Sequence, residues 1–200
     1  MTSVTRAKAD AVGRREDILN ATLAMIEDKG IDQVRGADLA KRVGVSVGLI
    51  FYHFDNLENL IISALRLAAS RDMEHLHAML ESVDGDVTTR VYAVLHEYGP
   101  TGTAFGWRLW VESWSASLRN PELRKVIRML DAGWRDVLIE LIDEGTKSGE
   151  FRCPDPAAAA WRITSLLDGL AVQVVVFDEA VSNEQVADWT RLTVSRELNG

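Results

Sequence analysis

The sequence contains a single cysteine, Cys153, among its 200 residues, and it has no apolar run long enough to cross a bilayer. One thiol excludes an internal disulfide and is typical of a reducing compartment, so we expect a cytoplasmic protein. A membrane-spanning helix needs about 18 apolar residues, whereas the longest run, "LAVQVVVF" at 170–177, is shorter and contains Gln173. No apolar stretch follows the polar and basic first 15 residues, so no secretory signal is expected.

Sequence patterns of catalytic and metal-binding sites are also missing. There is no G-x-S-x-G, Walker loop, zinc pattern or Cys–His neighbourhood. His75 and His77 are two positions apart, so on one helix their side chains point about 200° from each other and cannot chelate one metal ion. We therefore expect no enzyme, no metal ion and no cofactor.

An excess of basic residues is absent too, and the net charge of −8 argues against a general nucleic-acid binder. The charge is unevenly distributed, however. Residues 1–54 contain eight Lys and Arg against seven Asp and Glu, whereas residues 55–200 contain 14 against 23. All six tryptophans lie between Trp107 and Trp189. A polyanion is therefore expected near the mildly basic, Trp-free N-terminal part only.

Only helical periodicity is visible, and no alternating strand pattern or hairpin dipeptide stands out. Two helix starts are marked by a good N-cap residue followed by proline, at Asn120–Pro121 and at Asp155–Pro156. Another helix is expected to start at "DNLE", where Asp55 and Glu58 could form a capping box. We predict an all-α fold of nine or ten helices. A small head is expected at residues 1–55, followed by a larger domain at residues 56–200.

Residues 36–54 contain two short helices joined by "GVS". Gly44 allows a left-handed turn between them, and Ser46 is a good N-cap because its hydroxyl can accept an orphan backbone N–H. This spacing is that of a helix-turn-helix, whose second helix lies in the major groove of DNA. Ser46 and Tyr52 can donate hydroxyl hydrogen bonds to phosphate oxygens, and His53 can donate an N–H.

The segment "LAKRVGVSVGLIFYHFDNLENL", residues 39–60, resembles the signature of the tetracycline-repressor (TetR) family of transcriptional regulators. That signature consists of an I/L-A pair, G-V-S, x-G-x-[LI]-[YF]-x-H/Y-F and x-x-[KL]-E-x-L. The matching positions are Leu39, Ala40, Gly44, Val45, Ser46, Gly48, Ile50, Tyr52, His53, Phe54, Glu58 and Leu60. The segment from "ELRKVIRMLDAGWRDVLIELIDEGTKSGEF" through "LLDGLAVQ" is similar, more loosely, to the C-terminal domains of the betaine-regulator (BetI) branch.

The resemblance implies a homodimer that represses transcription from near-palindromic, double-stranded operator DNA, without a membrane partner. It further implies release of the operator when an unknown small molecule binds the C-terminal domain. Carried over position by position, the resemblance places Val47, Gly48 and Leu49 against bases, and Ser46, Tyr52 and His53 on phosphates.

The chain departs from the family pattern where DNA would be held. Val47 and Leu57 stand where many members have lysine, and Phe51 replaces a frequent tyrosine. Each neutralised phosphate contributes about 0.9 to the slope of affinity against salt, so the loss of two cations is expected to flatten that slope. Arg14, Arg15, Arg35, Lys41 or Arg42 could compensate, as could the N-terminal arm around Arg6 and Lys8. Of these, Arg35 and Lys41 are predicted DNA-binding residues. A small-molecule-binding helical protein with weak or lost DNA binding is the alternative, because it fits the missing lysines.

The stretch "FGWRLWVESWSASL", residues 105–118, places tryptophans along one face of a helix. One interpretation is ordinary core. The other is an aromatic-lined pocket with few polar groups, which is typical of small-molecule sites and would suit a cationic or hydrogen-bonding ligand. The predicted ligand-binding residues are Trp107, Trp110, Val111, Glu112 and Trp114, with Leu65, Arg66, Tyr92 and His96 as further walls.

The stretch "AAAAWRITSLLDGLAVQVVVF", residues 157–177, has small residues first and apolar residues nearly all round. A helix of this composition is buried, either against the same helix of a second copy or in an intramolecular core. The predicted dimer-interface residues are Trp161, Ser165, Leu166, Gly169, Leu170 and Gln173, joined by Trp189 and Leu192 from the last helix.

Overall fold

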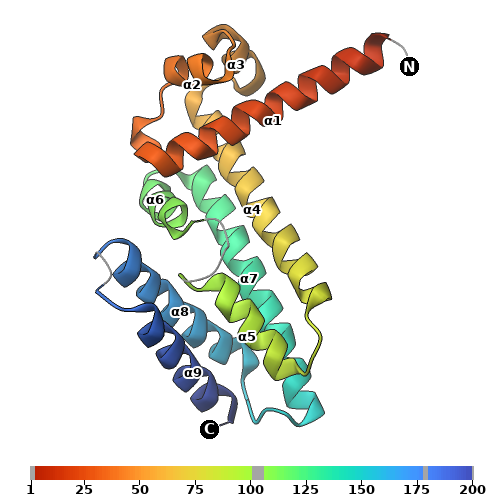
Figure 1. Ribbon diagram of the computed structural model, residues 1–200, viewed down its shortest axis with the longest axis vertical. Helices are drawn as coiled ribbons and strands as arrows, with labels where there is room; N and C mark the ends of the chain where they lie inside the picture. The colour runs from red at the N-terminus through yellow and green to blue at the C-terminus, as the bar shows by residue number, and fades with distance from the viewer. Residues whose placement is uncertain (1–2, 101–105, 178–179, 200) are drawn as a thin grey trace. The chain divides into compact units, whose positions relative to one another are not determined.

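The computed structural model describes residues 3–100, 106–177 and 180–199, with side chains from residue 13 onward. Over these residues the chain is all-α, as predicted, with nine α-helices and one 3-10 helix (Figure 1). The elements are α1 (Ser3–Lys29), η1 (Ile31–Gln33), α2 (Gly36–Val43), α3 (Val47–Phe54), α4 (Leu57–Ser82), α5 (Val87–Tyr98), α6 (Trp107–Ser117), α7 (Pro121–Ser148), α8 (Pro156–Val175) and α9 (Asn183–Asn199). None of these helices is long and apolar enough to span a membrane.

The chain divides into two compact units. Unit 1 comprises Met1–Ser70 and Glu112–Ile127, and unit 2 comprises Arg71–Val111 and Arg128–Gly200. The helices α4, α6 and α7 each contribute residues to both units. Compactness does not show where an independently folding part ends, so the predicted boundary after residue 55 stays a prediction.

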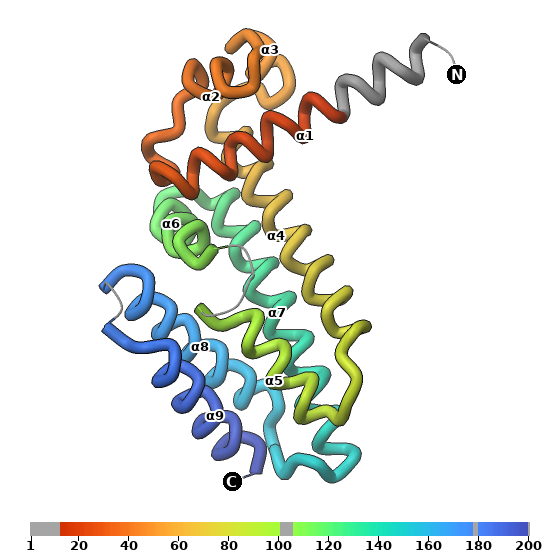
Figure 2. Tube along the Cα trace, in the orientation of Figure 1, coloured from red at the N-terminus to blue at the C-terminus, as the bar shows by residue number. Residues whose placement is uncertain are grey.

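The helix-turn-helix in unit 1 is built as the sequence predicts. Along the trace, α1 leads through η1 into α2 and α3, and α2 packs against both α1 and α3 (Figure 2). Gly44 ends α2 in the left-handed conformation, with φ 75°. Ser46 Oγ accepts a hydrogen bond from the backbone N–H of Leu49 at 3.1 Å and so caps α3. The fully buried side chains of Leu39 and Ile50 anchor the two helices to the core.

The start of α4 differs from the sequence prediction, in which Asp55 and Glu58 form a capping box. Asn56 is the cap instead, because its Oδ1 accepts a hydrogen bond from the N–H of Asn59 at 2.8 Å. Asp55 ends α3 with φ 63° and ψ −48°, in a γ-turn in which the N–H of Asn56 donates to the Phe54 carbonyl at 2.7 Å. Glu58 is thereby left to accept a hydrogen bond from Asn120 Nδ2 at 2.7 Å.

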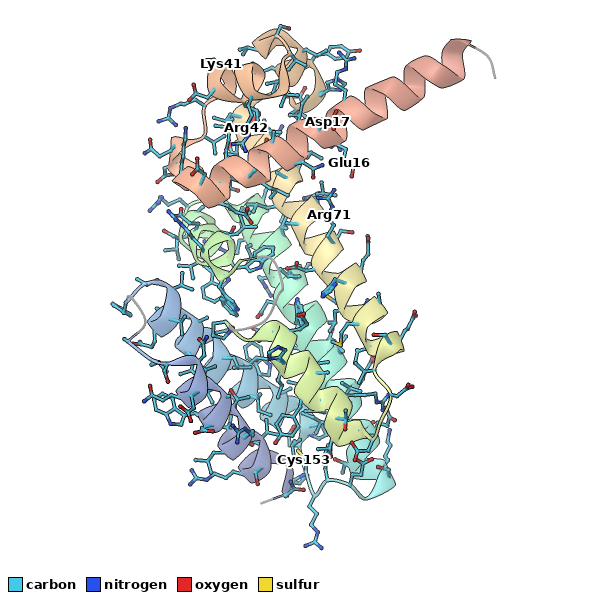
Figure 3. All side chains as sticks on the ribbon, in the orientation of Figure 1. Glu16, Asp17, Lys41, Arg42, Arg71 and Cys153 are labelled. Atoms are coloured by element: carbon cyan, nitrogen blue, oxygen red, sulfur yellow. The ribbon has the colours of Figure 1, made fainter. Side chains whose placement is uncertain are left out.

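The two proline-marked helix starts are confirmed. Asn120 Oδ1 accepts the N–H of Leu123 at 3.0 Å at the start of α7, and Asp155 Oδ1 accepts the N–H of Ala158 at 2.9 Å at the start of α8. In unit 2, α8 and α9 pack side by side. Cys153 lies in the loop before α8 and is only 3% exposed (Figure 3).

Candidate functional site

One face of α3 is open to solvent. Tyr52 is 82% exposed and Val47 is 37% exposed, and Gly48 is exposed beside them. Ile50 and Phe54 point the opposite way and are buried. Because the buried pair holds α3 on the head, the exposed residues are not needed for folding and are available to a partner.

The other predicted residues of α3 lie at the two ends of this face. Ser46 uses a lone pair to cap the helix, which leaves its hydroxyl proton to donate elsewhere. Leu49 is half-buried. His53 is also half-buried, and its ring meets that of Tyr52 edge to face with the centroids 5.5 Å apart. The structure therefore brings the six predicted α3 residues together on one short segment.

The two predicted cations in the head are both exposed but are held differently. The Nη1 of Arg35 donates to the carbonyl oxygens of Asp32 at 2.7 Å and Val34 at 3.0 Å, so its guanidinium closes the η1 turn. Arg35 is also the N-cap residue of α2, and its side chain makes no capping hydrogen bond. Lys41 lies on α2 beside Arg42, and both are exposed (Figure 3).

Arg15 of α1 brings a further cation to the end of α3. Its guanidinium carbon lies 4.9 Å from the centre of the Phe54 ring. Together with His53, Asn59 and Arg66, it lines a polar hollow of about 270 Å³. Arg66, predicted from sequence as a ligand contact, therefore lies in this hollow of unit 1.

Leu57, one of the two aliphatic residues noted where the family pattern has lysine, lines a different hollow in unit 1. This hollow of about 420 Å³ is also lined by Val34, Ile61 and Leu123. An aliphatic side chain suits these neighbours, and Leu57 is half-buried among them. A leucine at this position therefore has apolar neighbours in the head and in α7.

The nine predicted ligand-binding residues fall in both units. Leu65, Arg66, Glu112 and Trp114 belong to unit 1, whereas Tyr92, His96, Trp107, Trp110 and Val111 belong to unit 2. Leu65 is fully buried and Trp110 is 8% exposed. Glu112 Oε2 accepts a hydrogen bond from the backbone N–H of Ile31 at 3.4 Å, so its carboxylate serves the turn that leads into α2.

Two of these residues share a cavity in unit 2. Tyr92 and His96 of α5 line a space of about 230 Å³, which Leu167 of α8 and Thr190 of α9 also border. Arg191 is another wall residue, and its Nη2 donates to Asp188 at 2.7 Å. The cavity is therefore largely apolar, with its charged group already paired.

Tyr98 links two tryptophans to a half-buried carboxylate elsewhere in unit 2, in a group that we call the Tyr98 cluster: Tyr98, Trp107, Trp134 and Asp168. The Tyr98 ring meets Trp107 and Trp134 edge to face, with centroids 5.8 Å and 5.5 Å away. Its hydroxyl donates to Asp168 Oδ1 at 2.6 Å, and Trp107 Nε1 donates to the Tyr98 carbonyl at 3.1 Å. Only Trp107 was predicted from sequence.

Burial controls the charge state of this cluster. It raises the pKa of Asp168 to about 6, against the hydrogen bond from Tyr98, while the charge of Asp131 raises the pKa further and that of Arg135 lowers it. Burial, and then the charge of Asp168, raise the pKa of the Tyr98 phenol far above its usual value. At neutral pH the cluster therefore holds an ionised carboxylate beside a neutral phenol.

The sequence alone could have drawn attention to Asp168 as a candidate functional residue. It is the only charged residue between Arg162 and Asp178, in a stretch that is mostly apolar. A carboxylate in such a setting is rarely buried without a partner. Its partner, Tyr98, lies on another helix and carries no local signal of its own.

Most of the predicted dimer residues form an exposed face on α8 and α9. Trp161 is 54% exposed, Trp189 is 41% exposed and Leu192 is 49% exposed. Ser165, Gly169 and Gln173 are exposed as well, and Leu166 is half-buried. Leu170 does not belong to this face, because it is 5% exposed and packs inside unit 2.

Protein-family models match both the N-terminal and the C-terminal part of the chain. The model of "Bacterial regulatory proteins, tetR family" matches residues 18–74, and that of "BetI-type transcriptional repressor, C-terminal" matches residues 87–199. The HTH-type transcriptional regulator BetI of Cronobacter sakazakii is 24% identical over 194 residues, covering 94% of this chain and 92% of that protein. BetI of Escherichia coli K12 is 25% identical over 191 residues, covering 92% and 94%.

Solved structures agree with these matches. A putative transcriptional regulator from Saccharomonospora viridis, in complex with choline, has a TM-score of 0.84 and 26% identity, covering 92% of this chain and 96% of that one. A TetR regulator from Haloarcula marismortui also has a TM-score of 0.84, and its 19% identity supports the fold alone. Members of the matched family regulate transcription and are not enzymes. The chain belongs to the TetR family of DNA-binding transcriptional regulators and has a BetI-type C-terminal domain.

Proposed function

We propose that this regulator is a cytoplasmic repressor that occupies a near-palindromic operator as a homodimer and leaves it when a small cationic molecule binds in unit 2. The observation that carries the DNA-binding part is the open face of α3. On it, an exposed tyrosine and a helix-capping serine flank residues without bulky or charged side chains. Such a face can enter a major groove closely while its ends hold the phosphates.

The contacts divide by chemistry. Val47, Gly48 and Leu49 approach base edges, and the Val47 methyl groups suit a thymine methyl. Ser46, Tyr52 and His53 donate hydrogen bonds to phosphate oxygens. Arg35 and Lys41 add positive charge near the two ends of α2. The Arg35 guanidinium also donates to the carbonyl oxygens of Asp32 and Val34.

Val47→Lys should bind the operator more tightly and with a steeper dependence on salt. The side chain is 37% exposed, so the longer lysine fits without repacking and can reach a phosphate. Two added contacts per dimer should steepen the slope of log affinity against log salt by about 2. Anisotropy titrations of labelled operator in increasing KCl measure this slope. Val47→Met, which is long but uncharged, should leave the slope at the wild-type value, and an unchanged slope for Val47→Lys would contradict the placement of residue 47.

The Tyr98 cluster supports a cationic effector. Its rings offer electron-rich faces and Asp168 offers a negative charge, and both attract an ammonium group. The similar regulator from Saccharomonospora viridis was solved with choline, a quaternary ammonium. Choline is therefore the first effector to test, by its ability to release bound operator.

The exposed face of α8 and α9 supports the dimer. Leu192→Glu and Trp189→Glu should each convert the protein from a dimer to a monomer, because a carboxylate would be buried in an apolar contact without a partner. Light scattering after size exclusion should show a mass near twice 22.2 kDa for the wild type and near 22.2 kDa for these variants. Met129→Glu is the matched control, since Met129 is 72% exposed on α7 and outside this face. A dimer that survives both substitutions would place the interface elsewhere.

The alternative, a ligand-binding protein that has lost DNA binding, is favoured by the aliphatic residues at positions 47 and 57. The apolar neighbours of Leu57 weaken this argument, because an aliphatic side chain suits that position whether or not DNA is bound. Retardation of the DNA upstream of the chain's own gene separates the two functions. No retardation even at low salt would favour the alternative.

A further inference from the structure

The helix-turn-helix is held at both ends by polar contacts from one region of unit 1, which we call the α6–α7 corner (residues 112–124). Before α2, the backbone N–H of Ile31 donates to Glu112 Oε2 at 3.4 Å. After α3, Asn120 Nδ2 donates to Glu58 Oε1 at 2.7 Å, in the first turn of α4. The corner thus contacts the chain where it enters the DNA-binding motif and where it leaves it.

The entry contact depends on a glycine. Gly30 has φ +87°, a conformation that residues with a Cβ rarely adopt. A Cβ at this position would also lie only 3.1 Å from Glu112 Oε1. The glycine therefore serves two purposes, since it turns the chain out of α1 and leaves room for the carboxylate to reach the N–H of Ile31.

The α6–α7 corner is itself braced. Arg124 donates from Nε and Nη2 to the Ser117 carbonyl at 3.2 Å and 3.1 Å, and from Nη2 to the Leu118 carbonyl at 3.0 Å. These carbonyls end α6 and would otherwise have no helical partner. Asn120 uses both ends of its amide, because Oδ1 caps α7 through the N–H of Leu123 while Nδ2 holds Glu58. Such a corner can serve as a fixed support.

The packing beside these contacts is incomplete on the same side. The hollow of about 420 Å³ lined by Val34, Leu57 and Ile61 is also lined by Ala116 and Leu123 of the corner. Val34 and Leu123, which line this space, are themselves buried. Because the space between them is open, the polar contacts at the two ends add to this apolar packing in orienting the motif on the corner.

We propose that Glu112 and Asn120 are positioning residues for DNA recognition, which hold the helix-turn-helix in its binding orientation without touching DNA. This inference rests on the proposed operator binding. When either contact is broken, fewer heads have the competent orientation, and the apparent affinity falls in proportion to that fraction. The role differs from the ligand contact that the sequence suggested for Glu112.

Asn120→Asp tests the exit contact with the fold preserved. Aspartate is as good an N-cap as asparagine, so α7 keeps its start, but a carboxylate now faces Glu58. We expect the dissociation constant for operator, measured without effector, to rise about tenfold. The double variant Asn120→Asp/Glu58→Gln reverses the donor and acceptor and should restore binding to within about twofold, and Glu58→Gln alone should bind as the wild type does. Wild-type affinity in Asn120→Asp, or no rescue in the double variant, would overturn the proposal.

The entry contact is tested by Glu112→Ala, which removes the acceptor, against Glu112→Gln, which keeps an oxygen in place. Operator binding should weaken about fivefold in the first variant and stay near wild type in the second. Equal affinity in both would exclude a positioning role for Glu112.

Hydrogen exchange of the α2 and α3 amides provides a readout that needs no DNA. Exchange should be faster in Asn120→Asp and return to the wild-type rate in the double variant. A wild-type protein that fails to bind operator would overturn the proposed function, whereas unchanged exchange in Asn120→Asp would overturn the positioning role itself.

Discussion

Replacement of Tyr52 and His53 together by alanine should weaken operator binding by about 100-fold or more, because each head would lose two hydrogen-bond donors to phosphates. The fold should survive, since Tyr52 is 82% exposed and its main ring contact is with His53. Anisotropy titration of labelled operator, at one fixed salt concentration, measures the loss.

Two controls make this result specific. Tyr52→Phe keeps the ring and removes only the hydroxyl, so it should fall between the wild type and the double variant. The double variant should keep the thermal unfolding midpoint and the dimer mass of the wild type. If it binds operator with wild-type affinity, α3 does not hold phosphates through these residues and the orientation proposed for the helix is wrong.

The substitution Asp168→Asn should make the protein more stable at pH 7 and insensitive to choline. An ionised carboxylate in the Tyr98 cluster is unfavourable for folding, as its raised pKa shows, and asparagine can still accept the hydrogen bond from Tyr98. The same charge is what would attract a cationic effector. The variant should therefore gain folding stability and lose its response to choline, as expected where an unfavourable group is retained for function.

The pH dependence of stability provides a further check on Asp168. Its pKa is about 6 in the folded protein against an ordinary value of 3.8, so folding favours the protonated form. The stabilisation that this provides is complete below about pH 4 and is lost as the pH rises through 6. Because a pKa change of one is worth about 1.4 kcal/mol, the loss amounts to about 3 kcal/mol at most.

Urea unfolding at pH 4.5 and pH 7 measures this effect. The wild type should lose more stability over this interval than Asp168→Asn does, and Asp136→Asn, an exposed position on the same unit, should behave as the wild type. Choline-dependent release of operator should be missing in Asp168→Asn alone. Normal release in that variant would move the effector site away from the Tyr98 cluster.

The helix caps were predictable because capping depends on a few neighbouring residues. Gly44 and Ser46 are placed as expected, as is Asn120. Asp55 was chosen wrongly over Asn56 because both are good N-caps, and the choice depends on where α3 ends. Local chemistry could not decide between two adjacent caps.

The candidate sites also show what a local sequence pattern can and cannot predict. The open face of α3 follows from the pattern of one helix, in which Ile50 and Phe54 must be buried. The Tyr98 cluster needs residues from α5, α6, α7 and α8 to meet, which no local pattern specifies. Glu112 shows the same limit, because helical projection beside the tryptophans could not reveal that its carboxylate accepts a hydrogen bond from the distant Ile31.

The burial of Cys153 has a practical consequence for measuring how far apart the two heads of the proposed dimer are. At 3% exposure, this only thiol should resist labelling reagents in the folded protein. A cysteine introduced at exposed Asp38 of α2 would then carry a spin label on each head. Pulsed electron resonance would report the distance between the two labels, for comparison with the roughly 34–36 Å between successive major grooves. Cys153 therefore need not be replaced before these measurements, which can be made with and without choline.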